Sequence, residues 1–204
     1  MPSGDASGRI ISLYTRFGAA WSRSRGRSSF FEKPWIGKFL AAAENRNAPI
    51  YDFGCGDGWP IADHMAGEGR RVVGLDGSPS LIRIAKSRAR AGNWLVGDMR
   101  APPLRPTAGG VLAWHSFFHL TADDQRAVLA LFGELTTRGA ALMFTSGTEE
   151  GEAIGSFEGE PLYHASLDVA EYEERLAAAG FDIIALSRDT ADCGGATIWL
   201  ARRN

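Results

Sequence analysis

A glycine-rich turn directly after a short apolar strand is the feature that most limits how this chain can fold. The segment Asp52-Phe53-Gly54-Cys55-Gly56-Asp57-Gly58 follows the apolar start at Ile50 and precedes a helical pattern that begins near Ile61. Glycine adopts left-handed backbone conformations at little cost and lets another group approach the main chain closely. A strand, a tight glycine turn and a helix in this order predict the first unit of an open α/β sheet, with a ligand site outside the carboxyl end of the strand.

Strands and helices alternate along the rest of the chain. Further strands are expected at 71–75, 94–96, 111–114, 140–145, 183–186 and 197–201. Ser78, Thr121 and Asp168 stand where helix N-caps are expected, and the helix after Thr121 is expected to end at Gly139. The acidic stretch 147–165 is expected to be an irregular loop that acts as a lid. This alternation predicts one α/β domain whose mainly parallel sheet is covered by helices on both faces.

Size, charge and cysteine content limit the class of protein. The chain has 204 residues and a formal net charge of -2, which suits one domain and gives no bias toward nucleic acid or an anionic membrane. No apolar run approaches the roughly 20 residues that span a bilayer, and the polar start lacks a signal-peptide core. Cys55 and Cys193 have neither a metal-ligand spacing nor that of a disulfide framework. We therefore expect a cytoplasmic protein with no metal site and no membrane contact.

The spacing of the glycines and two later carboxylates indicate the kind of ligand. A dinucleotide fingerprint reads G-x-G-x-x-G, but here Trp59 occupies the place of the third glycine, and no Lys-Ser/Thr pair completes a P-loop. Asp76, at the end of the second strand, can accept hydrogen bonds from two ribose hydroxyls. Asp98, after the third strand, can accept from an adenine amino group while Met99 lies against the ring. Together these features predict a nucleoside ligand without a pyrophosphate.

The three segments 52–58, 74–76 and 97–99 together resemble class I S-adenosylmethionine-dependent methyltransferases. The resemblance implies a Rossmann-like seven-stranded sheet in the order 3-2-1-4-5-7-6, with the last strand antiparallel and helices on both faces. Residues 114–120, 159–167 and 193–195 further resemble a small bacterial subfamily without a settled substrate. Relatives often carry aspartate where Gly109 and His115 stand here, so strand packing and the surroundings of the methyl group are expected to differ.

The same resemblance implies S-adenosylmethionine as cofactor and assigns residues to it. The glycine turn would hold the aminocarboxypropyl part, Asp76 the ribose and Asp98 the adenine. Residues 1–45 would form a helical cap on a binding domain at 46–204, and Arg27 in that cap would pair with the cofactor carboxylate. The full expected set is Trp21, Arg27, Asp52, Gly54, Cys55, Gly56, Gly58, Asp76, Gly77, Ser78, Gly97, Asp98, Met99, Trp114 and Ser116.

Histidines are the candidate bases for the reaction. Methyl transfer to an oxygen or nitrogen that carries a proton needs a base, and histidine suits neutral pH. His119 and His115 follow the fourth strand, beside the expected methyl position, and rank ahead of His164 in the acidic stretch. His64, on the helix after the glycine turn, is expected to have a structural or surface role.

A small-molecule acceptor is the preferred hypothesis, with the protein a monomer or homodimer. An RNA or DNA methyltransferase is an alternative, supported by the basic stretch at 22–29, but residues 114–117 read Trp-His-Ser-Phe and lack the pattern of enzymes that methylate base amino groups. A non-catalytic binder of the same cofactor stays open because of the change at His115. A dinucleotide oxidoreductase is disfavoured by Trp59.

Overall fold

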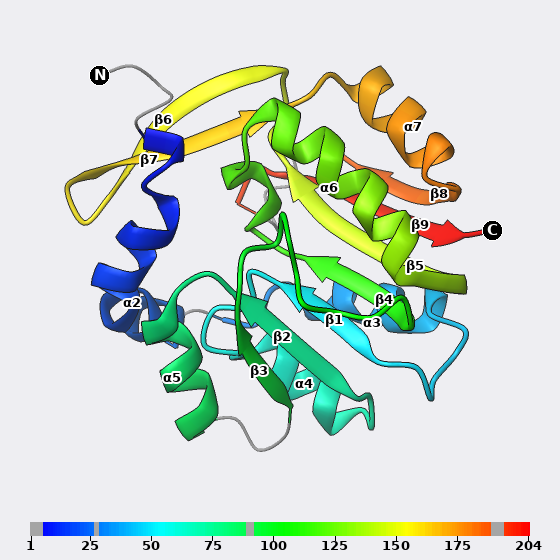
Figure 1. The fold of residues 1–204 in the computed structure, drawn as a ribbon, viewed down its shortest axis with the longest axis horizontal. Coiled ribbons are helices and arrows are strands. Elements are labelled where there is room, and N and C mark those ends of the chain that lie inside the picture. Colours follow the sequence, from blue (N-terminus) through cyan, green and yellow to red (C-terminus); the bar gives the residue numbers. More distant parts are fainter. Residues whose placement is uncertain (1–5, 27–28, 89–91, 189–193) are drawn as a thin grey trace.

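The protein is a single α/β sheet with helices on both faces and a separate two-stranded hairpin beside it (Figure 1). The computed structural model describes residues 6–26, 29–88, 92–188 and 194–204. The helices are α2 (Ile10–Arg25), α3 (Lys33–Ala42), α4 (Ile61–Gly67), α5 (Pro79–Arg88), η1 (Phe117–His119), α6 (Ala122–Leu135) and α7 (Val169–Ala178). The strands are β1 (Ile50–Phe53), β2 (Val72–Asp76), β3 (Asn93–Val96), β4 (Ala108–Ala113), β5 (Thr136–Ser146), β6 (Gly151–Phe157), β7 (Glu160–Ser166), β8 (Phe181–Ser187) and β9 (Thr197–Arg203).

The strand order confirms the expected fold class. The seven strands lie in the order β3-β2-β1-β4-β5-β9-β8, which is the expected 3-2-1-4-5-7-6 renumbered because the hairpin adds β6 and β7. The first five strands pair in parallel, while β9 runs antiparallel to both β5 and β8. Because β1 to β4 are parallel, the glycine turn, Asp76, Gly97 and Trp114 all emerge at the same edge of the sheet. Successive strands are added on one side of β1 up to β3 and on its other side from β4 onward. Ligands of open α/β sheets bind at the point between β1 and β4 where this order changes.

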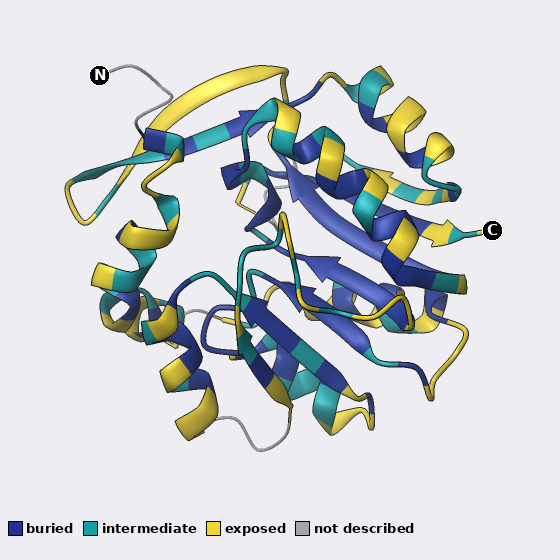
Figure 2. Ribbon diagram, viewed as in Figure 1, coloured by how far each residue is buried: buried dark blue, intermediate teal, exposed yellow. Residues whose placement is uncertain are grey.

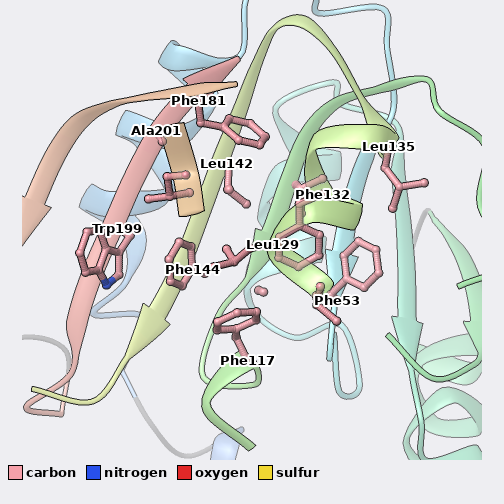
Figure 3. Packing of buried hydrophobic residues seen from close by; sticks show 14 of the residues in the cluster. Phe53, Phe117, Leu129, Phe132, Leu135, Leu142, Phe144, Phe181, Trp199 and Ala201 are labelled. Carbon is pink, nitrogen blue, oxygen red and sulfur yellow. The ribbon is translucent and has the colours of Figure 1, made fainter. Parts of the chain in front are cut away.

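Alternate residues of the central strands build two cores, one on each face. Phe53 and Phe144 pack against Phe132 of α6 and Trp199 of β9, with the Phe144 and Trp199 rings stacked at 5.8 Å (Figure 3). On the opposite face, α3 and α4 bury side chains such as Phe39 against the same strands. Burying each large apolar side chain stabilises the fold by roughly 1.5–3 kcal/mol. The sheet that carries the site is therefore held rigidly from both sides.

The acidic stretch 147–165 is a β-hairpin, so the expectation of an irregular loop is wrong. Strands β6 and β7 pair antiparallel from Gly151 with Ser166 to Phe157 with Glu160. Glu158 and Gly159 turn between them with φ of 52° and 79°, as a two-residue hairpin turn requires. Strand β6 is exposed almost throughout (Figure 2), so its sequence lacks the alternation of apolar and polar residues that marks a half-buried strand. The Glu-Gly pair between two equal runs is the signal that could have identified the hairpin.

The boundary between α6 and β5 also differs from expectation. Helix α6 begins after Thr121, whose side chain accepts from the Asp124 main-chain N–H as expected of an N-cap. The helix ends at Leu135, however, and β5 begins at Thr136, so Gly139 lies within the strand with φ of 74°. The pairing of β5 with β4 shifts register there, which identifies a bulge. β-Branched Thr136 and Thr137 favour the extended strand over a longer helix.

The N-terminal helix α2 packs beside α5 and reaches the hairpin. The Ser80 hydroxyl of α5 donates to the Thr15 carbonyl over 2.8 Å, and Phe157 at the end of β6 stacks on Tyr14 with centroids 5.6 Å apart. Arg16 pairs with Glu160 at 2.9 Å, an exposed ion pair. Helix α2 extends to Arg25 and so includes the first half of the basic stretch 22–29.

Across the part of the chain that the structure describes, no helix is both long and apolar enough to cross a membrane.

Candidate functional site

The glycine turn after β1 forms the floor of the site. The main-chain N–H groups of Gly54 and Cys55 both donate to the Leu75 carbonyl, at 2.7 and 3.2 Å. Gly54 has φ of 68° and Gly56 φ of 59°, conformations that residues with a side chain rarely adopt. A Cβ on Gly54 would lie 2.2 Å from Ser116 Cβ, and one on Gly56 would lie 2.5 Å from the Trp21 ring. Glycine is therefore required at both positions, and Ser116 and Trp21 pack directly on the turn.

Asp76 points its carboxylate at this turn. Its Oδ2 accepts from the Gly56 main-chain N–H at 2.9 Å, and its Oδ1 accepts from that of Ser78 at 2.8 Å. Burial raises the pKa of Asp76, and these two hydrogen bonds oppose that rise. A carboxylate has about four acceptor positions, so two remain after the main-chain bonds are made. The side chain is thus fixed in place with acceptors to spare for a ligand.

Asp98 carries an ion pair that the sequence pattern does not predict. Arg100 Nε lies 2.9 and 3.0 Å from the two carboxylate oxygens, and Arg100 Nη1 reaches Asp124 at 3.2 Å. The hydrogen bonds from Arg100 hold the pKa of Asp98 below its usual value. Both Arg100 and Asp124 line the same cavity as Asp98. Neither Arg100 nor Asp124 was among the expected site residues, because nothing in the sequence links either of them to Asp98.

Two adjoining cavities open at this edge of the sheet. The first cavity lies by β2 and β3 and is lined by Gly54, Gly56, Asp76, Gly77, Ser78, Gly97, Asp98, Met99 and Ser116, among others. The second lies by the other side of the glycine turn and includes Asp52, Cys55, Gly58 and Trp114. Tyr14, Trp21, Gly54, His115 and His119 line both. Every expected site residue thus borders one cavity or the other except Arg27, which lies outside the described residues.

An ion pair from the N-terminal segment borders the second cavity. Arg25 and Glu32 form a short salt bridge, with Glu32 only 1% exposed. The second carboxylate oxygen of Glu32 and the Trp114 indole N–H are buried without hydrogen-bond partners in the described structure. Burial, followed by the nearby Asp76, raises the pKa of Asp52 to about 8 in the same cavity. The resemblance places a cofactor-binding arginine at 27, whereas the structure brings Arg25 to the cavity.

His119 is held in one tautomer by its two hydrogen bonds. Its Nδ1 lies 2.8 Å from the Tyr163 main-chain carbonyl, and its Nε2 lies 3.0 Å from the Tyr14 hydroxyl. A carbonyl only accepts, so Nδ1 carries the proton, Nε2 is the acceptor and Tyr14 is the donor. Burial lowers the pKa of His119 to about 4, so the ring is neutral at pH 7. Tyr14, on the N-terminal helix, was missed because nothing in the sequence links it to a histidine 105 residues away.

His115 occupies a strained backbone position between the cavities. Its φ is 49°, and its main-chain N–H donates to the Thr145 hydroxyl at 2.9 Å. Burial, and then the nearby Arg25, lowers the pKa of His115 to about 4. Strained non-glycine positions of this kind cluster at functional sites. The side chain is therefore a neutral ring at the junction of the two cavities.

The contacts of the other two histidines, and of Gly109, bear on their expected roles. His164, on β7, borders the second cavity beside Phe118, with ring centroids 5.2 Å apart. His64 packs on Phe30 and borders neither cavity, in agreement with a structural role. A Cβ on Gly109 would lie 2.7 Å from that of Ala48 and 2.9 Å from the Asn45 carbonyl oxygen, so a residue with a side chain has no room at the start of β4.

Comparison with known proteins agrees with this geometry. Residues 50–139 match a family model described as a methyltransferase domain. A malonyl-[acyl-carrier protein] O-methyltransferase from Serratia marcescens is 28% identical over 140 residues, covering 66% of this chain and 54% of that protein. The mouse 18S rRNA (guanine-N(7))-methyltransferase is 36% identical over only 70 residues, 34% of this chain and 25% of that protein. The chain thus spans little more than half the length of the first relative.

Solved structures extend the likeness to the whole chain. Magnesium protoporphyrin IX methyltransferase from Synechocystis, with bound S-adenosylhomocysteine, has a TM-score of 0.76 at 16% identity and covers 98% of this chain and 100% of its own. A 1,6-didemethyltoxoflavin-N1-methyltransferase from Burkholderia thailandensis has a TM-score of 0.76 at 16% identity, and the match covers 100% of this chain and 91% of that protein. The chain therefore shares the fold of these methyltransferases, and residues 50–139 match the methyltransferase-domain model.

Proposed function

We propose that this chain binds S-adenosylmethionine in the first cavity and transfers its methyl group to a small molecule in the second. One observation carries the proposal. The glycine turn, Asp76 and Asp98 emerge from three successive parallel strands and border one cavity, in the arrangement that a nucleoside ligand requires. The methyltransferase-domain match over these same strands supports it, as do the relatives crystallised with S-adenosylmethionine or its product.

The residues present fit this cofactor. Asp76 has two acceptor positions left for ribose hydroxyls, and Asp98 with Met99 borders the far end of the cavity, where adenine would lie. Beside the glycine turn, the Glu32 oxygen that has no hydrogen-bond partner and the Asp52 carboxyl group offer acceptors for the ammonium group of the cofactor. Trp21 of the N-terminal cap covers Gly56, consistent with a cap at 1–45 over a binding domain at 46–204.

When bound, S-adenosylmethionine supplies a methyl group on a cationic sulfur, so that an acceptor lone pair forms the new bond while the carbon–sulfur electron pair returns to sulfur. The chain must align the acceptor and exclude water. Tyr14 and Trp21, from helix α2, border both cavities and so cover the point where they join. The stacking of Tyr14 on Phe157 and the Arg16–Glu160 pair hold this helix against the hairpin.

Tyr14 and His119 provide a route for the acceptor proton. The Tyr14 hydroxyl donates a hydrogen bond to His119 Nε2. The lone pairs of the Tyr14 oxygen are therefore free to take the proton from the O–H or N–H group of the molecule that is methylated. The Tyr163 carbonyl, which accepts from Nδ1, stabilises the charged ring that results. Because burial favours neutral His119, the proton is released once water returns with the departing product. We therefore propose that Tyr14 takes the proton directly from the methylated molecule, and that His119 takes the proton that Tyr14 gives up.

A small acceptor, a monomer or homodimer and a cytoplasmic location belong to the same proposal. The second cavity has a volume of about 350 Å³. This lies within the roughly 300–1,000 Å³ typical of small-molecule sites. Nucleic acid is not favoured, because the similarity to the mouse 18S rRNA (guanine-N(7))-methyltransferase covers only 34% of this chain.

Calorimetry and turnover together test the proposal. Titration of S-adenosylhomocysteine into the purified chain is expected to show one site. A panel of small hydroxyl and amine compounds, assayed with S-adenosylmethionine, is expected to include one that yields S-adenosylhomocysteine. If no heat is observed at millimolar ligand, the cofactor assignment is wrong. If binding occurs but no acceptor in a broad panel turns over, the non-catalytic alternative is supported instead.

A further inference from the structure

The part of the second cavity that lies beyond the glycine turn is walled by aromatic rings. Phe31 lines it from the segment between α2 and α3, Trp59 from the end of the glycine turn, and Phe118 and His164 from η1 and β7. None of these four borders the first cavity. They are therefore placed to contact an acceptor rather than the adenosyl part of the cofactor.

The wall is continuous from the hairpin to the junction of the cavities. The Phe118 ring lies 5.2 Å from His164, 4.9 Å from His119 and 5.8 Å from His115, measured between centroids. The guanidinium groups of Arg88 and Arg25 lie over the Trp59 and Phe31 rings, 5.6 and 5.7 Å from the ring centroids. Trp59 and Phe31 still stay 40% and 37% exposed, so part of each ring surface remains accessible. Partly exposed aromatic rings that gather at a cavity, rather than being scattered, indicate a binding surface for an apolar ring.

The charged groups that border this cavity are neutralised. Arg25 is paired with Glu32. Burial lowers the pKa of His115 to about 4 and lowers that of His164, and it raises the pKa of Asp52 to about 8, so all three are uncharged at pH 7. An acceptor that carries a phosphate or a carboxylate into this part of the cavity would lose its hydration without gaining an unpaired cation, at a large cost.

From the aromatic wall, the paired charges and the Tyr14 hydroxyl at the junction, we infer that the acceptor is a flat, uncharged aromatic compound with a ring O–H or N–H. The inference rests on the proposed function and narrows its substrate class. In the transfer, the acceptor oxygen or nitrogen forms a bond to the methyl carbon as the carbon–sulfur bond breaks. Its proton passes to Tyr14 as Tyr14 gives its own to His119, so charge and atoms balance.

Three matched probes test the class of compound. 2-Naphthol is flat, neutral and carries an O–H; 2-decalol has the same carbon skeleton but is saturated; 2-naphthoate is flat but anionic. Each is titrated by calorimetry into protein saturated with S-adenosylhomocysteine at pH 7. We expect 2-naphthol to bind about tenfold or more tightly than either other probe, since ring stacking and charge both favour it. Equal binding of 2-decalol, tighter binding of 2-naphthoate, or no binding of any probe would each overturn the inference.

Two variants locate the bound ring. Phe118→Leu and Trp59→Leu are each expected to weaken 2-naphthol about three- to tenfold while S-adenosylhomocysteine affinity changes little, because a single stacked ring accounts for that much. Trp35→Leu, on α3 and outside both cavities, is the matched control and should leave both affinities unchanged. If S-adenosylhomocysteine binds normally but both cavity variants bind 2-naphthol like the unmodified chain, the aromatic wall is not the acceptor site. If S-adenosylhomocysteine itself fails to bind, the proposed function is what fails.

Discussion

Tyr14 on the N-terminal helix and His119 after β4 share one hydrogen bond of 3.0 Å, although 105 residues separate them in the chain. The direction of that bond is fixed, because the other ring nitrogen of His119 must donate to the Tyr163 carbonyl. Both ring nitrogens of His119 are therefore engaged, so a proton from the methyl acceptor reaches Nε2 by way of the Tyr14 hydroxyl. This relationship changes which residue is expected to take part directly in proton transfer.

Replacing Tyr14 tests that relationship. With any acceptor that turns over, Tyr14→Phe is expected to lower kcat by about 10²–10⁴-fold, the usual contribution of a general base, while S-adenosylhomocysteine affinity is retained because the ring stays. His119→Asn should lower kcat less than Tyr14→Phe, since it acts at one remove. Steady-state kinetics and calorimetry measure both quantities. A larger loss in His119→Asn than in Tyr14→Phe would assign the base to the histidine itself.

The neutral state of His119 predicts a pH dependence of stability. Its pKa is about 4 in the folded chain, below the ordinary value of 6.5, so the unfolded chain binds more protons between these values. The contribution of His119 to the free energy of unfolding therefore falls as the pH is lowered from 6.5 to 4, by up to about 1.4 kcal/mol per pH unit. Denaturant unfolding of the unmodified chain and His119→Asn should show a difference that decreases over this range. A constant difference would contradict burial of a neutral ring.

The role of Asp76 predicts a loss of cofactor binding. Asp76→Ala removes two free acceptor positions, and charge-assisted hydrogen bonds of this kind contribute about 1.5–3 kcal/mol. Calorimetry with S-adenosylhomocysteine should therefore show weakening of about 10–100-fold. Asp182→Ala, at an exposed position of β8, is the matched control and should bind as the unmodified chain does. Unchanged affinity of Asp76→Ala would reject the ribose assignment.

The glycine turn predicts a strong position effect. Gly54→Ala forces a Cβ to 2.2 Å from Ser116 Cβ and leaves alanine in a left-handed conformation, which alone costs about 1–2 kcal/mol. We expect lower thermal stability and weak cofactor binding. Gly37→Ala is the matched control, because Gly37 sits in helix α3 and no atom lies within 4 Å of where its new Cβ would stand. That variant should gain about 0.5–1 kcal/mol in the free energy of unfolding.

The buried Arg25–Glu32 pair predicts non-additive substitutions. Arg25→Leu leaves the Glu32 carboxylate buried without its partner, which typically costs about 3–5 kcal/mol. Arg25→Leu combined with Glu32→Leu should recover most of this loss, because no buried charge remains. Urea unfolding of the two single variants and the double variant measures the coupling. A double variant as unstable as the sum of the single ones would show that the two side chains act independently.

The sequence predicted those parts of the candidate site that directly follow the parallel strands. The glycines, Asp76 and Asp98 each follow a strand, and parallel strands bring their carboxyl ends to one edge whatever else the chain does. The hairpin was not predicted, because β6 is exposed on both faces and lacks the alternation by which a half-buried strand is recognised. Trp21, expected in a cap over the cofactor, packs on Gly56 of the glycine turn, whereas Arg25 could not be distinguished from its neighbours Arg23 and Arg27.

What the sequence determined by itself is therefore the alternation of strands and helices and the glycine turn, since these depend on short-range periodicity and on the conformational freedom of glycine. The strand order was expected only from the resemblance to a known family. Only the tertiary structure decided which side chains from distant segments meet: Tyr14 with His119, Arg25 with Glu32, and the aromatic rings of the second cavity. Such contacts depend on how α2 and the hairpin pack against the sheet. That packing is set by many weak interactions, which leave no periodic trace in the sequence.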